Sequence, residues 1–318
     1  MISRRRFTMG AGLVASGLAQ ANATELNTWV VPFSAGSAQD TIARLLAPPF
    51  AQTLGKQTII QNISGAGGTI GAASVAKSQP DGRTLLLAAS SLHLSGALHP
   101  QLSYHPLNSF RAGAFLGFSE YVLVASANLH VVSLGEFVKR AAASPGTLNF
   151  GSSGTGSATH VAMATFLARS GLDLTHIPFK GTGETVQHLL AGRIHAAMLP
   201  MLVAYQFQTE ARLVPLASTG LERSLHLPSL PTFSESGYPG FQLTSWAGLL
   251  APKSVPDSTI IRIDDTMRHV LSDPLVKRQL HAIGVSSSYL GYEQFDRLLH
   301  SNWSKATTNV RHLKISAD

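Results

Sequence analysis

Two glycine-rich turns carry the residues best suited to hold a ligand. The first is PFSAGSAQD, Pro32 to Asp40, and the second is QNISGAGGTIG, Gln61 to Gly71. Each follows a short apolar run and precedes a segment with helical spacing, which predicts a strand, a loop and a helix. Such a loop directs unpaired backbone N–H groups and the positive end of a helix to one spot, where an anion binds without a basic side chain. Together the turns indicate a carboxylate site.

The candidate ligand-binding residues of these turns expose backbone N–H groups or stand at a helix start. Three glycines within four positions ahead of a helix favour an open N–H cradle over a purely structural turn. Asp40 leaves two alternatives open, because it can complement the helix dipole or orient a ligand-bound water. The candidates are Phe33, Ala35, Gly36, Ala38, Gln39, Asp40, Gly65, Ala66, Gly67 and Gly68.

Hydroxyl side chains gather at two further strand ends. One serine alone is more often a helix cap or turn former, and one histidine alone a structural hydrogen-bonding group, so the clustering is what favours ligand contact. Acids are scarce around these turns: Asp40 is the only one between Leu26 and Pro80, and Asp173 the only one between Ser144 and Thr182. The candidates here are Ser90, Ser91, Ser153, Thr155, Gly156, Thr159 and His160, with Ser152 and Ser157 in the same cluster.

Strand-like runs alternate with helical stretches, which is typical of α/β sheets. Two helices have apolar residues at i, i+3 and i+4 spacing, namely Met163, Phe166 and Leu167, then Phe295, Leu298, Leu299 and Trp303, which we interpret as core packing. The strand-like runs are Trp29–Phe33, Thr58–Ile60, Thr84–Ala88, Tyr121–Ala125, Leu148–Phe150, His176–Phe179, Ile194–Met198 and Leu213–Ala217.

The N-terminal sequence has the features of a removable export signal. Arg4, Arg5 and Arg6 form a charged segment, an apolar stretch follows, and Ala21-Asn22-Ala23 supplies a cleavage signal. The arginines also fit a twin-arginine signal, with ordinary secretion as the alternative. We therefore expect cleavage after Ala23, a mature chain that starts at Thr24, and a periplasmic location.

Composition narrows the function classes. The chain has no cysteine, which excludes a disulfide framework, a thiol nucleophile and a cysteine metal site. Without the three arginines of the leader, 21 basic residues face 17 acidic ones, a net charge of +4 that does not argue for nucleic acid. Removing 23 of 318 residues leaves 295, enough for two domains. No run in the mature part reaches the roughly 20 apolar residues of a membrane span.

Enzyme motifs are missing. The chain has no H-E-x-x-H, no G-x-S-x-G and no Walker loop, and Gly65, Gly67 and Gly71 do not have the G-x-G-x-x-G spacing of a dinucleotide fingerprint. We expect no enzyme, no cofactor and no metal. A nucleotide-binding α/β oxidoreductase remains the alternative from another class, and absence of cofactor absorbance in the purified protein would reject it.

Six motifs, in order, resemble a known family, the periplasmic receptors of tripartite tricarboxylate transporters, also called Bug receptors. PFSAGSAQD resembles the family's PFPPGGGTD, and QNISGAGGTIG its ENRPGAGGNIG. PDGRTLL from Pro80 resembles PDGYTLL, and HIPFKGTG from His176 contains the counterpart of HVPYKG. The segments that begin at Ser144, SPGTLNFGSSGTGSATHVA, and at Leu227, LPSLPTFSESGYPGFQLTSWAGLLAP, match two more. The resemblance covers essentially the whole mature chain.

The resemblance implies a two-lobed, Venus-flytrap periplasmic-binding-protein fold of type II, with α/β lobes and the ligand between them. We expect the chain to cross near Ala125 and near Trp246. Trp246 would pack at the hinge, with lining of the cleft wall as the alternative. Lobe 1 would then comprise residues 24–125 and 247–318, and lobe 2 residues 126–246. The implied function is capture of a small di- or tricarboxylate or related organic acid by a monomer, and its delivery to integral-membrane transporter subunits. A sensor protein is the alternative partner.

Three departures from the family pattern have consequences. Ser37, Ala38 and Gln39 replace two glycines and a threonine in the first loop, which makes that loop stiffer. Pro48 and Pro49 fall inside a helix, so we expect a kink or an early stop near Ala47. His195 replaces the usual Asp. If it lines the cleft, it favours more highly charged ligands and affinity that rises as pH falls; the alternative is a half-exposed histidine at a strand end.

Overall fold

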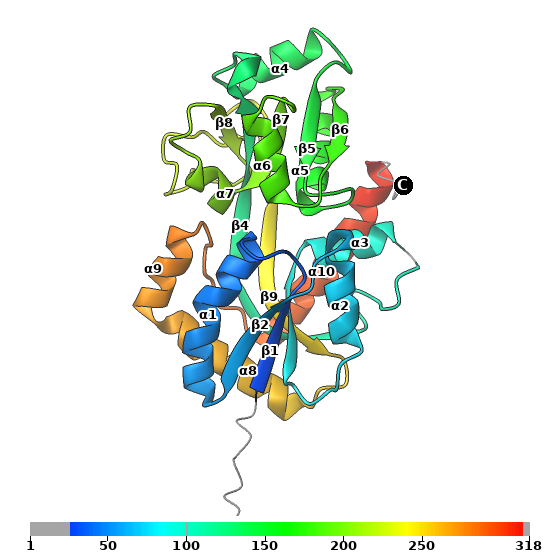
Figure 1. Ribbon diagram of the computed structural model, residues 1–318, viewed down its shortest axis with the longest axis vertical. Helices are drawn as coiled ribbons and strands as arrows, with labels where there is room; N and C mark the ends of the chain where they lie inside the picture. Colours follow the sequence, from blue (N-terminus) through cyan, green and yellow to red (C-terminus); the bar gives the residue numbers. More distant parts are fainter. Residues whose placement is uncertain (1–25, 100, 314–318) are drawn as a thin grey trace, which may run out of the picture.

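The computed structural model describes residues 26–99 and 101–313, so the expected leader and its cleavage point lie outside the described residues. The chain forms two α/β lobes, one above the other in Figure 1, joined by long strands.

The first lobe is built from both ends of the chain. Its elements are β1 (Leu26–Val31), α1 (Ala38–Leu54), β2 (Gln57–Asn62), η1 (Ala66–Gly68), α2 (Thr69–Ala76), β3 (Thr84–Ala89), α3 (Ser91–Leu98), the first part of β4 (Phe110–Ser126), β9 (Thr244–Pro252), α8 (Asp257–Ser272), α9 (Pro274–Ala282) and α10 (Tyr292–His312). The sheet order is β2-β1-β3-β9-β4, with β1 parallel to β2 and β3, and β9 antiparallel to its neighbours.

The second lobe is built from the middle of the chain. Its elements are the last part of β4, η2 (Ala127–Leu129), α4 (Leu134–Ala142), β5 (Asn149–Ser152), α5 (Ala158–Ser170), β6 (Thr175–Pro178), α6 (Thr182–Leu190), β7 (Ala196–Pro200), α7 (Met201–Gln206) and β8 (Leu213–Ser218). Strands β5, β6 and β7 are parallel, and β4 lies antiparallel between β7 and β8.

Strand β4 connects the two sheets. It is 17 residues long, pairs with β9 up to Glu120, and pairs with β7 and β8 from Tyr121 or Val122 onward. The chain therefore passes between sheets near Glu120 and Tyr121, earlier than the crossing expected at Ala125. It returns where β9 begins at Thr244, close to the crossing expected at Trp246.

Each lobe has hydrophobic cores on both faces of its sheet. In β1, Trp29 and Val31 point to the face covered by α1, α8 and α9, while Val30 points to the face of α2, α3 and α10. This follows from the two-residue period of a strand. Met163 and Phe166 of α5 are buried in the second lobe, and Phe295 and Leu299 of α10 in the first, which confirms the expected core packing.

The expected early stop of the first helix is wrong. Helix α1 runs to Leu54 through Pro48 and Pro49, and ends at Gly55 with a φ of 72°. Pro48 is exposed, so water can reach the carbonyl groups that lose a helical donor on that side. Phe50, just after the prolines, is only 1% exposed and packs edge-to-face on Trp29, which stabilises continuation of the helix.

Candidate functional site

The carboxyl ends of the parallel strands of both lobes point toward the crossing. In the first lobe, Ala89 at the end of β3 pairs with Ala247, near the start of β9. In the second lobe, Pro200 at the end of β7 pairs with Tyr121, the first residue of β4 beyond the crossing. Ligands of α/β sheets bind outside the carboxyl ends of strands. The loops predicted to bind ligand therefore face one cleft.

The first glycine-rich loop is fixed by a buried carboxylate. Ser37 Oγ accepts from the Asp40 amide at 3.2 Å, which caps α1. Asp40 Oδ2 accepts from Gly36 N at 2.9 Å and Arg44 Nε at 2.9 Å, and Oδ1 accepts from Asn62 Nδ2 at 3.0 Å. Burial raises the pKa of Asp40, but these hydrogen bonds outweigh it and hold the pKa below its usual value. Asp40 thus holds the loop in shape.

The second glycine-rich loop packs directly on the first. Asn62 Nδ2 also donates to Phe33 O at 3.0 Å, and a Cβ at Gly71 would lie 2.9 Å from Pro32 Cα. Gly67 has a φ of 65° and Gly68 a φ of 95°, backbone conformations that favour glycine.

The loops leave their backbone open to the cleft. Ala35, Gly36, Gly65 and Ala66 are exposed, Phe33, Ala38, Gln39 and Gly67 are half-buried, and Gly68 is buried against Pro32. Ala38 and Gln39 are the first residues of α1, where amides have no acceptor within the helix. The structure therefore places the first-lobe candidates of both loops side by side.

Of the two serines at the end of β3, Ser90 is half-buried and Ser91 is buried. Ser90 Oγ accepts from the Trp246 amide at 3.0 Å and so links α3 to β9 at the crossing. Ser91 is the first residue of α3, is 8% exposed, and lines a small hollow together with Gly67 and Gly68. The Trp246 ring is 2% exposed and packs on Phe295 at 5.4 Å, which confirms packing at the hinge.

The hydroxyl cluster of the second lobe is largely engaged with itself. Thr159 Oγ1 accepts from Ser153 N at 3.0 Å and lies 3.0 Å from Ser153 Oγ and 3.1 Å from Ser157 Oγ. Ser157 Oγ accepts from His160 N and caps α5. Thr155 is half-buried and makes no hydrogen bond within the part of the chain that the structure describes. Its hydroxyl is therefore available to a ligand.

Two stacked histidines support this turn. His160 Nδ1 accepts from Gly156 N at 3.0 Å, and its ring stacks on that of His176 with centroids 3.7 Å apart. His176 Nε2 lies 2.7 Å from Ser152 Oγ. Burial lowers the pKa of both histidines to about 4. Both are neutral at pH 7, so His160 acts as a structural hydrogen-bonding group.

The lobes touch on both sides of the cleft. On one side, Leu98 of α3 fills the space in which Gly156 would carry a side chain. On the other side, a Cβ at Gly284 would lie 3.0 Å from Met201 Cγ, so the segment after α9 contacts α7. Gly156 therefore lies against the C-terminal end of α3, and the two lobes are in contact at both places.

His195 is not brought to the cleft. It precedes β7, and its carbonyl accepts from Ser126 N at the far end of β4. Its Nδ1 lies 2.9 Å from Asn149 Oδ1. Pro200, the last of the five residues of β7, lies at the other end of this strand, a length of about 16 Å at roughly 3.3 Å per residue. The structure places it at a strand end, as the alternative interpretation had it, and the prediction that depends on cleft lining loses its basis.

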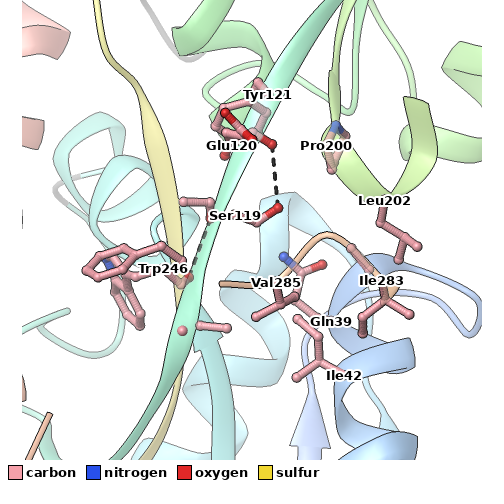
Figure 2. Close-up of a pocket in the computed structure, with 15 residues that line it drawn as sticks. Gln39, Ile42, Ser119, Glu120, Tyr121, Pro200, Leu202, Trp246, Ile283 and Val285 are labelled. Atoms are coloured by element: carbon pink, nitrogen blue, oxygen red, sulfur yellow. Dashed lines mark hydrogen bonds between the residues drawn. The ribbon is translucent and has the colours of Figure 1, made fainter. Parts of the chain in front are cut away.

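The cavity between the lobes is lined by the predicted Gln39 and by residues that sequence reasoning missed. Figure 2 shows Ile42 of α1 close to Gln39, Ile283 and Val285, with Leu202 of the second lobe nearby. Asn62 was also missed, because its partners lie 22 and 29 residues away along the chain. Only the position of Pro200 and Leu202 just after a predicted strand hinted at a cleft position.

Within residues 26–99 and 101–313, no helix combines the length and the apolar character of a membrane span. Across the same ranges, no group of three or more histidine, cysteine, aspartate and glutamate side chains is placed to hold a metal ion.

Comparisons with known proteins agree with this geometry. Residues 42–314 match the model of the family described as tripartite tricarboxylate transporter family receptor. BugT of Bordetella pertussis is 32% identical over 282 residues, which cover 88% of this chain and 86% of BugT. The structure of the periplasmic binding protein BugD superposes with a TM-score of 0.85 at 26% identity, over 92% of this chain and 99% of BugD.

A ligand is present in a further similar structure. MatC from Rhodopseudomonas palustris, with bound malate, is similar with a TM-score of 0.83 at 29% identity, over 90% of this chain and 99% of MatC. The match to the family model spans most of the chain. The chain therefore belongs to the tripartite tricarboxylate transporter receptor family and has its two-lobed periplasmic-binding-protein fold.

Proposed function

We propose that the protein is a periplasmic receptor that captures a small carboxylate between its lobes and delivers it to a tripartite tricarboxylate-type membrane transporter. The observation that carries this is the pairing of two glycine-rich loops at one wall of the cleft, tied together by Asn62. Their exposed backbone offers N–H donors where Arg and Lys are not needed.

Each lobe has a part in binding. The first lobe holds one carboxylate with the amides at the start of α1 and around Gly67. The second lobe adds the Thr155 hydroxyl and the N-terminal end of α5, whose partial positive charge favours an anion. A ligand that contacts both lobes stabilises the closed arrangement over the open one, which is hinge closure by differential binding.

The malate in MatC supports a carboxylate ligand, because that protein shares the fold and 29% of its residues with this chain. The family consists of receptors, which supports a binding role without catalysis. We infer that residues 1–23 direct export, that the mature monomer begins at Thr24, and that the partners are integral-membrane transporter subunits, with a sensor protein as the alternative. Intact-mass analysis of periplasmic material checks the cleavage point.

The test is a thermal-shift screen with carboxylates and their neutral amides of equal shape, such as malate and malamide. A ligand at a hundredfold excess over Kd stabilises the folded state by about 2.7 kcal/mol, which raises Tm by roughly 5 °C. We expect at least one carboxylate to give such a shift and its amide to give none. Equal shifts for acid and amide, or no shift across mono-, di- and tricarboxylates, would contradict the proposal.

A further inference from the structure

A cavity of about 50 Å³ lies between the lobes, beside the crossing of β4 and β9. Its wall includes Ala38 and Gln39, the first residues of α1, so it adjoins the proposed carboxylate position. A cavity needs roughly 10–15 Å³ to hold one water molecule, so this cavity accommodates about four waters or a short hydrocarbon segment.

Hydrocarbon side chains from both lobes form the walls. In Figure 2, Ile42, Ile283 and Val285 approach from the first lobe and Leu202 from the second, while the Trp246 ring lies on the other side of the strands. No lysine, arginine or histidine is among the described residues that line the cavity. No cationic side chain of this lining compensates the cost of removing a second carboxylate from water.

The polar side chains along the strands that line the cavity include neutral hydroxyls and one carboxyl group. Ser119 Oγ lies 3.5 Å from Glu120 O, and Ser245 Oγ 3.4 Å from Trp246 O, so both hydroxyls have long bonds within their own strands. Glu120 itself lines the cavity and places its carboxylate against Gly220. Burial raises the pKa of Glu120, which means that the carboxylate already has little water to share.

Gln39 provides a polar side chain at the start of α1. The carboxamide of Gln39 makes no hydrogen bond within the described residues and points toward the cavity in Figure 2. A carboxamide can donate to a carboxylate at the start of α1 while the wall beyond it stays apolar. The cavity is therefore polar at one end and hydrocarbon at the other.

From this we infer, on the basis of the proposed function, that the ligand is a monocarboxylate with a short apolar body. Its carboxylate lies at the start of α1 and the glycine-rich loops, and its hydrocarbon part enters the cavity between Ile42, Leu202 and Ile283. The preference for one negative charge is a property of this cavity, and di- and tricarboxylates are disfavoured.

Hexanoate and adipate test the inference, because they share six carbons and differ in one terminal carboxylate. Calorimetry at pH 7.5 on the mature protein is expected to give at least tenfold tighter binding of hexanoate. Equal or tighter binding of adipate overturns the inference and leaves the proposed function standing. If neither these two nor any other carboxylate binds, the proposed function fails with it.

A charge swap in the cavity sharpens the test. Ile283→Lys, at a half-buried position, supplies the missing cation and should remove the preference for hexanoate or reverse it. The matched control is Leu225→Lys, where the side chain is 78% exposed and lies outside the cavity. If the ratio of the Kd values for hexanoate and adipate were unchanged in folded Ile283→Lys, the inference would be overturned. Should that variant not fold, the wild-type ratio alone decides.

Discussion

The two lobes meet the cleft with different chemical groups. The first lobe presents open backbone at Gly65, Ala66 and Gly67, and its one nearby acid, Asp40, is used to hold the loop. The second lobe presents hydroxyls, yet most of them bond one another, and Thr155 alone in its cluster makes no such bond within the described chain. Backbone donors are already aimed outward, whereas hydroxyls at a strand end first satisfy their own turn.

The largest expected effect comes from filling the first-lobe cradle. Gly67→Asp places a carboxylate and a Cβ beside the open amides, where the Cβ lies 3.0 Å from Ser95 Oγ. Two charge-assisted hydrogen bonds at about 1.5 kcal/mol each are lost, so affinity for a confirmed carboxylate falls about a hundredfold. Isothermal calorimetry measures the change.

The control for this variant is Gly171→Asp at the end of α5. Gly171 has a similar φ of 68° and open space around it, so it carries the same backbone strain away from the cleft. It should lose stability but keep its affinity. Wild-type affinity in folded Gly67→Asp would mean that the second loop is only a structural turn.

A second test concerns the histidines that support the second lobe. The pKa of His176 is about 4 in the folded protein and about 6.5 when unfolded, so between these values the unfolded chain binds more protons. Its contribution to stability is complete above about pH 6.5 and is lost as pH falls toward 4. His93, buried in the first lobe with no hydrogen-bond partner among the described residues, acts in the same direction.

His176→Gln isolates the second-lobe part, because glutamine can bond Ser152 but cannot titrate in this range. Urea unfolding gives the free energy of unfolding at pH 7 and at pH 4.5. We expect this free energy to fall between the two pH values by about 1–2 kcal/mol less in His176→Gln than in wild type, after allowance for solvent at this partly exposed ring. The same change at the exposed His269 should leave the difference as in wild type. If the free energy of unfolding depended on pH in the same way in both variants, the stacked histidines would not contribute to the pH dependence of stability.

A smaller effect is expected from the free hydroxyl of the second lobe. Thr155→Ala removes one neutral hydrogen bond worth about 1 kcal/mol, so carboxylate affinity should fall about fivefold. Thr165→Ala is the matched control in α5, since Thr165 Oγ1 donates to Val161 O within the helix. If Thr155→Ala lost as much carboxylate affinity as Gly67→Asp, the second lobe would contribute as much to binding as the first.

The smallest expected effect is at His195. Its ring is held by Asn149 far from the cleft, and burial together with Arg140 lowers its pKa. His195→Asn should therefore leave affinity and its pH dependence unchanged between pH 5.5 and 8 in calorimetric titrations. A change in the pH dependence would show that the second lobe couples this strand end to the ligand.

The sequence predicts the order of strands and loops well, because alternation of apolar runs and glycine-rich turns is a local property. The structure has β1, β2, β3 and β5 to β8 close to the predicted runs. Strand β9 was missed, since its pairing with β3 and β4 is non-local. The continuation of α1 through Pro48 depended on where Phe50 packs, which no local pattern reveals.

The site residues also fall into those that local sequence predicts and those that depend on distant parts of the chain. Positions with special backbone, such as Gly67 and Gly68, could be proposed from sequence because only glycine adopts their φ easily. The roles of Asn62 and His176 could not, because each depends on a partner more than 20 residues away. The cavity walls at Ile283 and Leu202 come from different lobes and exist only once the chain has folded.

The uninterrupted course of β4 has a mechanical consequence. Its ladder with β9 continues to the pair Glu120–Thr244, and the next residue already bonds to β7, so the lobes are joined by a hydrogen-bonded ribbon. Rotation of one lobe relative to the other therefore twists this ribbon. A paired two-stranded ribbon has a preferred twist, which favours one angle between the lobes. Its amide protons should exchange slowly with deuterium whether the lobes are open or closed.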